Sequence, residues 1–214
     1  MTRGLKIGLV SGFVLAMSAG LLASRQLPRA AAQTPEAAIV PADFSATITN
    51  PLLPLSSLGP KVFEGIEVDQ DTNEKVAARL ESRVLPDRTV VAGVTVTVLE
   101  ERVFADGELI EVALDHFAQH KDGSVYYFGE HVDNYENGVL KDHEGAWLAG
   151  EGDNQPGIII PANPAVGQTN IQENAPGIAE DQATIEALDE TVVVPTGTYH
   201  GCMKTKEFTP LEPG

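Results

Sequence analysis

Three turn dipeptides separate runs of alternating apolar and polar residues in the middle of this 214-residue chain. They are Asp106-Gly107, Asp122-Gly123 and Asn137-Gly138. Both central residues of a type I′ turn need a positive φ, which Asp, Asn and Gly adopt at low cost, so these dipeptides are typical of tight β-hairpins. The three turns therefore predict four consecutive antiparallel strands.

Alternation with a period of two continues on both sides of these hairpins, and no segment has a helical period. A Gly- and Pro-rich loop is expected at 150–164. The predicted fold class is all-β, an antiparallel meander that forms a barrel, half-barrel or sandwich. We expect strands at 61–68, 74–84, 89–104, 108–120, 124–133, 139–148, 167–173, 180–194 and 199–208.

The first 32 residues have the pattern of a secretory signal peptide. Arg3 and Lys6 precede an apolar run from Ile7 to Leu22, and small residues follow at 30–32. We expect cleavage there, a secreted or extracytoplasmic bacterial protein and no membrane span afterwards; a retained N-terminal anchor is the alternative. The mature chain then comprises an extended Pro-rich lead-in at 33–60, whose apolar part is expected to pack across the domain, and a single β domain at 61–214.

Charge and cysteine content exclude several classes of function. The chain has 14 Lys and Arg against 31 Asp and Glu, a net charge of -17, which repels the phosphate backbone of nucleic acids. Its single cysteine, Cys202, cannot form an internal disulfide. No nucleotide-binding motif occurs, and we expect no cofactor.

The tight turns also predict which residues share a face of the sheet, because a two-residue loop sets the register of its hairpin. Both faces are substantially apolar near the middle, as in a curled sheet or one covered on both sides. One face is predicted to carry Val96, Phe117, Phe128 and Trp147 beside Val98, Asp115, Glu130 and Gly145. The other is predicted to carry Thr97, His116, Gly129 and Ala146 beside Leu99, Leu114, His131 and Glu144.

A metal site is one interpretation of the second face. His116 and His131 are diagonal neighbours in this register, with Glu144 opposite His131, and two imidazoles with a carboxylate are ligands that Zn or Fe sites use. The alternative is a few polar residues at a barrel mouth, bonded to one another and to water.

A ligand-binding site is an interpretation of the first face. Asp115 opposes Glu130, and directly opposed carboxylates are unfavourable unless a cation or a shared proton relieves them. With Phe117, Phe128 and Trp147 in the next row, one interpretation is an aromatic platform that binds a sugar beside the paired acids. The alternative is that the aromatic row is core and the acids lie at a solvated edge.

Short motifs in the chain resemble those of an uncharacterised family of secreted bacterial β-proteins. The resemblance covers most of residues 43–214 and brings no known activity or ligand. It implies an aromatic residue at the position of His116, which counts against the metal site. It rests on Tyr126-Tyr127-Phe128-Gly129-Glu130, Tyr135-Glu136-Asn137-Gly138, Glu144-Gly145-Ala146-Trp147, Gln155-Pro156-Gly157-Ile158, Pro161-Ala162 and Glu207-Phe208-Thr209-Pro210-Leu211-Glu212.

The same resemblance implies a further strand pair beyond Gly214. No proline interrupts the predicted strand at 199–208, so an unpaired edge there is free to pair with another chain. We expect a chain that ends at Gly214 to be less stable and more association-prone than one extended by two strands.

The leading hypothesis is a secreted β-sheet binding module for a hydrophobic or amphipathic small ligand or an envelope protein partner. Its ligand-binding residues are those of the first face: Asp115, Phe117, Phe128, Glu130 and Trp147. The alternatives are a metal-dependent enzyme that uses the histidines and Glu144 of the second face, and a structural cell-surface module without a pocket. Enzyme activity is left open, with binding favoured.

Overall fold

The computed structural model describes residues 39–68 and 73–211. The predicted signal peptide at 1–32 and the chain end at Gly214 lie outside the described residues. Within them the protein is almost entirely β-structure, with two short 3₁₀ turns, Pro41–Asp43 (η1) and Leu55–Ser57 (η2). The predicted all-β class is confirmed, in its half-barrel form.

A large antiparallel sheet is built from ten strands and has the main order β11-β9-β6-β5-β4-β3-β2. Strand β1 pairs with β5, and β7 and β8 pair with β6. The strands are β1 (Phe44–Ser45), β2 (Lys61–Val68), β3 (Lys75–Val91), β4 (Val94–Ala105), β5 (Glu108–His120), β6 (Val125–Glu136), β7 (Val139–Asp142), β8 (Trp147–Leu148), β9 (Gln155–Ile160) and β11 (Glu173–Asn174).

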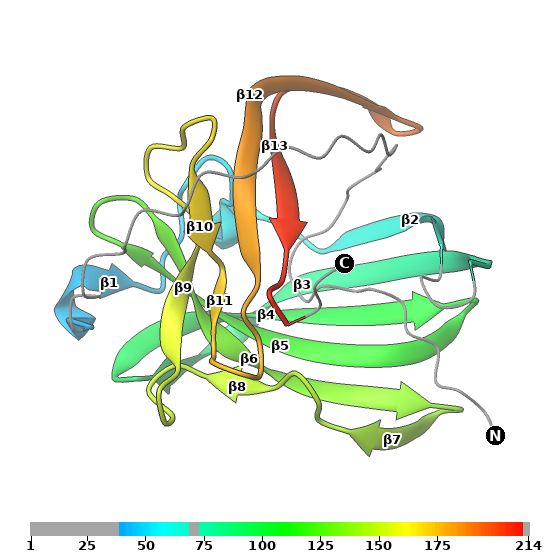
Figure 1. Cartoon of the computed structure of the whole chain (residues 1–214), viewed down its shortest axis with the longest axis horizontal. Coiled ribbons are helices and arrows are strands. Elements are labelled where there is room, and N and C mark those ends of the chain that lie inside the picture. Colours follow the sequence, from blue (N-terminus) through cyan, green and yellow to red (C-terminus); the bar gives the residue numbers. More distant parts are fainter. Residues whose placement is uncertain (1–38, 69–72, 212–214) are drawn as a thin grey trace.

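A second sheet has the order β10-β12-β13 and comprises Thr169–Ile171, Gln182–Val194 and Gly197–Phe208. Figure 1 shows the long strands β3 to β6 as one curled layer, with the β12–β13 hairpin, in orange and red, crossing it at a steep angle. Long twisted strands curl in this way because each strand is rotated relative to its neighbour.

Two of the three predicted type I′ turns are confirmed. Asp106 and Gly107 have φ of 50° and 85°, and Asn137 and Gly138 have 52° and 74°. At the third, Gly123 has a positive φ but Asp122 does not, and the loop closes through a hydrogen bond from the His120 amide to the Ser124 carbonyl. This connection is therefore a longer loop than the dipeptide alone predicts.

The predicted strand at 89–104 is wrong, because a hairpin turn at Ala92-Gly93 divides it between β3 and β4. Ala92 has a φ of 48°, which an alanine adopts less readily than Asn or Asp, so the sequence carried no strong turn signal there. The predicted strand at 139–148 is likewise interrupted, since β7 ends at Asp142 and β8 begins at Trp147. The expected loop at 150–164 contains β9, Gln155–Ile160.

The lead-in packs against the large sheet. Ile48, Leu53 and Leu55 are buried in the main hydrophobic core, together with strand residues such as Val96 and Phe128. The expectation that the apolar part of the lead-in packs across the domain is confirmed for these residues. Burial of such side chains stabilises the fold by about 1.5–3 kcal/mol each.

β-Bulges correct the predicted register between the hairpins. Ala105 pairs with Glu108 as the turn predicts, but a shift next to Val103 then places Leu99, and not Val98, opposite Asp115. A second shift, between Asp115 and Phe117, separates two parts of the β5–β6 ladder. A bulge adds one residue to one strand and so reverses the faces of all residues beyond it.

Candidate functional site

One face of the large sheet, here called the inner face, carries the candidate site. It is the face turned toward β11 and the start of β12, and its central row runs across five strands. The row begins with apolar residues on β3 and β4, continues with carboxylic acids on β5 and β6, and ends with a tryptophan on β8. Its members are Val84, Leu99, Asp115, Glu130 and Trp147.

Asp115 and Glu130 face each other across β5 and β6, as the sequence predicts. They do not lie at a solvated edge: Asp115 is 6% exposed and Glu130 only 1%. The Tyr127 hydroxyl donates a hydrogen bond of 2.7 Å to Asp115 Oδ1. Burial is the main reason why the pKa of both carboxyls is raised well above the ordinary value. The charge of Glu101 raises the pKa of Asp115 further, and the charge of Asp115 raises that of Glu130.

Three aromatic rings border this pair. Phe117 is stacked on Tyr127 with ring centroids 4.8 Å apart, and Tyr127 meets Trp147 edge-on at 5.6 Å. The predicted aromatic platform is therefore corrected in one member: Tyr127 takes the place of Phe128. The cause is the bulge at Gly129, whose φ is 101°; Phe128 packs instead against Phe44 at 5.3 Å.

Further carboxyl groups extend the cluster in both directions. Glu101 on β4 and Glu111 on β5 are half-buried, and burial raises the pKa of Glu101 to about 7. On the opposite side Glu173 of β11 is buried, and burial together with Asp181 and Asp115 raises its pKa to about 9. The acidic cluster of the inner face is defined as Glu101, Glu111, Asp115, Glu130, Glu173 and Asp181.

Three buried polar atoms at this cluster have no hydrogen-bond partner among the described residues: Glu130 Oε2, Glu173 Oε1 and Trp147 Nε1. A buried polar group without a partner costs about 1–3 kcal/mol, so such atoms concentrate where a function requires them. The indole N–H nevertheless lies close enough to Glu173 to lower the pKa of that carboxyl against the larger effect of burial.

An apolar cavity of about 60 Å³ adjoins the acidic cluster on the same face. The two regions are continuous, because Ser82 borders the cavity and its side chain hydrogen-bonds Glu101. Lys61 also borders the cavity, whereas the guanidinium of Arg83 is ion-paired with Glu100 on the other face of the sheet. The cavity is otherwise bordered by Leu55, Leu58, Gly59, Phe63, Val84 and Leu99.

The predicted metal residues are only partly brought together. The rings of His116 and His131 are 5.3 Å apart and nearly perpendicular. His116 is buried, with Nδ1 bonded to the Gly129 carbonyl at 2.9 Å, and burial lowers the pKa of its imidazole. Glu144 does not oppose His131 as predicted, because it lies in the turn between β7 and β8.

Within residues 39–68 and 73–211, no three or more His, Cys, Asp or Glu side chains are placed so that they could hold a metal ion. The metal hypothesis therefore gains no support from the part of the chain that the structure describes.

Sequence reasoning missed Tyr127, Glu101, Glu111 and the residues of β11 at this site. Glu101 and Asp115 come to the same face only after the bulge next to Val103, for which the sequence has no clear signature. Glu173 reaches the cluster through non-local packing, which hairpin register cannot predict. A signal did exist at Gly129, a glycine inside a strand, which often marks a bulge.

No protein family model, curated protein or solved structure matches this chain. Among the described residues, no helix is both long and apolar enough to cross a membrane.

Proposed function

We propose that this protein is a secreted binding module that holds an amphipathic small ligand on the inner face of its half-barrel. The observation that carries the proposal is the continuity of an apolar cavity and a buried acidic cluster on one face, joined at Ser82 and Glu101. Small-molecule sites are concave, mostly apolar and contain a few convergent polar groups. An apolar cavity beside buried polar atoms without partners fits that description.

The apolar end of the ligand is assigned to the cavity between Leu55 and Phe63. A cavity of about 60 Å³ receives only the end of a hydrocarbon chain. Strand β2 forms one wall of the cavity and is an edge strand of the sheet, so the wall can shift without breaking a ladder on its outer side. Phe63 itself is 37% exposed, which leaves part of its ring available to a ligand.

The polar end is assigned to the acidic cluster. Its carboxyls run from the half-buried Glu101 and Glu111 to the buried Asp115 and Glu130. The exposure of the carboxyls therefore decreases along the sheet face, from Glu101 and Glu111 to Asp115 and Glu130. This arrangement supports a ligand that carries both an apolar and a polar part over a purely hydrophobic one.

Intrinsic fluorescence offers a direct test, because Trp147 is the only tryptophan of the chain and lies in the proposed site. The experiment titrates delipidated protein with ten-carbon amphiphiles and follows the emission of Trp147. We expect a saturable change, accompanied by a rise of several degrees in Tm. No change in emission or Tm with any amphiphile would overturn the proposal.

A pair of variants on β2 controls for unspecific binding. Phe63→Ser removes a ring that borders the cavity, and we expect it to weaken binding at least fivefold. Val62→Ser removes an exposed apolar side chain on the opposite face of the same strand, and we expect it to leave affinity within twofold. Equal effects of the two variants would place the binding site elsewhere.

A further inference from the structure

Asp115, Glu130 and Glu173, the buried carboxyls on which this inference depends, form no ion pair with a Lys, Arg or His among the described residues. The ion pairs between described residues join a Lys, Arg or His to a carboxyl elsewhere in the protein. Lys61, at the rim of the cavity, forms none of these pairs. Buried acids without a counter-charge are normally neutralised by protons or by a bound cation.

The unpartnered atoms point to a ligand that donates hydrogen bonds. Glu130 Oε2 and Glu173 Oε1 are buried and have no hydrogen-bond partner among the described residues. They come from different strands, β6 and β11, yet Glu173 raises the pKa of Glu130 and Asp115 raises the pKa of both, so the two lie near each other in space. A group with several N–H donors and a positive charge satisfies both acceptors at once.

The aromatic neighbours favour an organic cation over a bare ion. Tyr127 and Trp147 stand edge to face beside the carboxyls, and the faces of such rings attract ammonium groups. The acids are also distributed over several strands of the sheet rather than directed at one point. This arrangement suits an elongated molecule with a charged head.

We propose that the acidic half of the inner face binds the protonated amine of an amphipathic ligand. Glu130 and Glu173 accept hydrogen bonds from the ammonium group, and Tyr127 and Trp147 pack against the carbon atoms next to it. This inference rests on the proposed function, whose apolar cavity holds the rest of the molecule.

Amine binding must displace protons from the carboxyls. An ammonium ion gains most from ionised carboxylates, so each carboxyl that pairs with it releases its proton to solvent. The pKa of Glu173 is about 9 and that of Glu101 about 7, which keeps both groups largely protonated at mildly acidic pH when no ligand is bound. Affinity for the amine therefore rises between pH 5 and pH 8.

The titratable groups that face this region come from every strand packed around it. They are Glu101 on β4, Glu111 and Asp115 on β5, Tyr127 and Glu130 on β6, Glu173 on β11, Asp181 before β12 and, next to Asp181, Glu207 on β13.

Three probes with the same hydrocarbon chain separate the head-group inference from the proposed function. They are n-decylamine, n-decanol and n-decanoate, titrated at 150 mM salt while Trp147 emission is followed. We expect decylamine to bind at least tenfold more tightly than the other two. Calorimetry in two buffers with different ionisation enthalpies is expected to show release of about one proton.

Other patterns of affinity overturn the inference in distinguishable ways. Equal binding of decanol and decylamine, or tighter binding of decanoate through Lys61, rejects the amine and retains the amphipathic site. Absence of binding by all three probes rejects the proposed function as well. Amine binding without proton release rejects the buried carboxyls as its partners.

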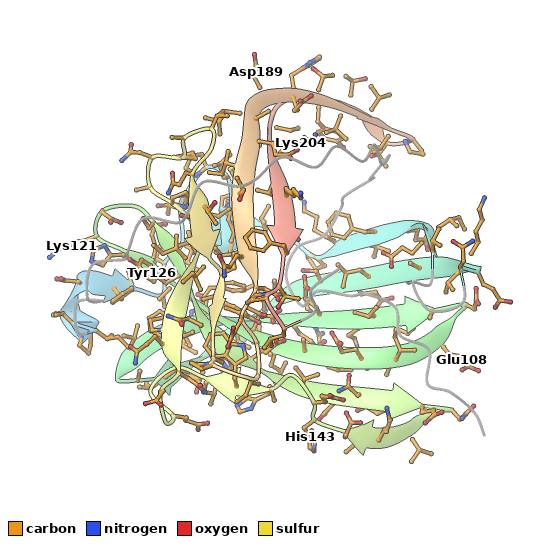
Figure 2. All side chains as sticks on the ribbon, viewed as in Figure 1. Glu108, Lys121, Tyr126, His143, Asp189 and Lys204 are labelled. Carbon is orange, nitrogen blue, oxygen red and sulfur yellow. The ribbon has the colours of Figure 1, made fainter. Side chains whose placement is uncertain are left out.

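Matched variants locate the amine. Glu130→Gln and Glu173→Gln each remove one acceptor charge, and we expect a loss of at least fivefold in decylamine affinity with little change for decanol. Glu108→Gln removes an exposed acid at the far end of β5 (Figure 2), and we expect no more than a twofold change. If all three variants bind decylamine like the wild type, the amine lies outside the acidic cluster.

Discussion

Leu99 and Asp115 oppose each other across β4 and β5, and both are buried, but burial affects their free energies with opposite signs. Removing the apolar Leu99 from water stabilises the fold, whereas removing the Asp115 carboxyl from water costs free energy unless it stays protonated. The row therefore has an apolar half, Val84 and Leu99, whose burial stabilises the fold. It also has an acidic half, Asp115 and Glu130, whose burial costs free energy. Buried carboxyls that lower the stability of an otherwise stable fold are candidates for a functional site.

Burial of the apolar residues must offset the free energy that burial of the carboxyls costs. Val84, Leu99 and the lead-in residue Leu55 belong to or contact the main core, which continues through Phe117 and Tyr127 to Trp147. The aromatic rings are thus members of both regions. Substitutions in the apolar half and in the acidic half are therefore expected to change the free energy of unfolding by different amounts, with different signs and with a different dependence on pH.

The largest effect is expected at Gly129, whose bulge brings Tyr127 and Glu130 to the same face. A Cβ there would overlap the Trp147 carbonyl, and the φ of 101° is unfavourable for any other residue. We expect Gly129→Ala to lower the free energy of unfolding by about 3–5 kcal/mol, from strain and overlap combined.

Gly138→Ala is the matched control for that substitution. It also has a positive φ, 74°, but its Cβ would meet no atom within 4 Å. We expect it to cost about 1 kcal/mol. Chemical denaturation of both variants measures the difference, and equal losses would mean that the bulge does not constrain the site.

In the apolar half, Leu99→Ala is expected to lower the free energy of unfolding by about 2–5 kcal/mol. Leu99 is 2% exposed and borders the cavity, so its loss enlarges an existing space. Because no charge changes, the loss is expected to be the same at pH 5 and pH 8. A loss that varies strongly between these two values would show that the two halves are not separable.

In the acidic half, stability is expected to fall as the pH rises. Glu101 and Glu173 have raised pKa values of about 7 and 9 in the folded protein, above the ordinary value of 4.5. Above about pH 4.5 the folded state therefore holds protons that the unfolded state has lost. The free energy of unfolding decreases as the pH rises, until the pH exceeds the pKa values of the two groups in the folded protein. Denaturation at pH 5 and pH 8 should differ by about 2 kcal/mol or more; greater stability at pH 8 would contradict the assignment of neutral acids.

The smallest effect is expected for Asp115→Asn. Asparagine keeps an oxygen that accepts the hydrogen bond from Tyr127, and it removes a carboxyl that burial disfavours. We expect a gain of about 1 kcal/mol at pH 8 and almost none at pH 4.5. Asp189→Asn, at an exposed position of β12 (Figure 2), serves as the control for removal of one negative charge; a gain equal to that of Asp115→Asn would indicate a general effect of net charge.

Local sequence predicted the parts of this fold that local geometry determines. Strands 61–68 and 108–120 and the pairing of Asp115 with Glu130 follow from alternation and turn chemistry, and the structure confirms them. The Ala92-Gly93 turn was missed because its first residue is not one that favours a positive φ. The side chains that face Asp115 depend on bulges, each of which shifts the register by one residue without changing the alternation pattern.

The rest of the candidate site depends on non-local contacts. Glu173 joins the acidic cluster because β11 pairs with β9 at the far side of the sheet, and no hairpin links it to β5 or β6. Its burial, and its lack of an ion pair with any residue that the structure describes, can be known only from the assembled fold.

On this account the inner face holds Glu101, Asp115, Glu130 and Glu173 as neutral acids. Side-chain carboxyl NMR of the folded protein, titrated from pH 4 to pH 10, tests this claim most directly. The account predicts that Glu101 titrates near pH 7 and Glu173 near pH 9, that Asp115 and Glu130 remain protonated well above their ordinary range, and that Glu186, whose pKa is lowered by Lys204, titrates first. If all four inner-face carboxyls instead lose their protons below pH 5, they are solvated or paired, and the claim is wrong.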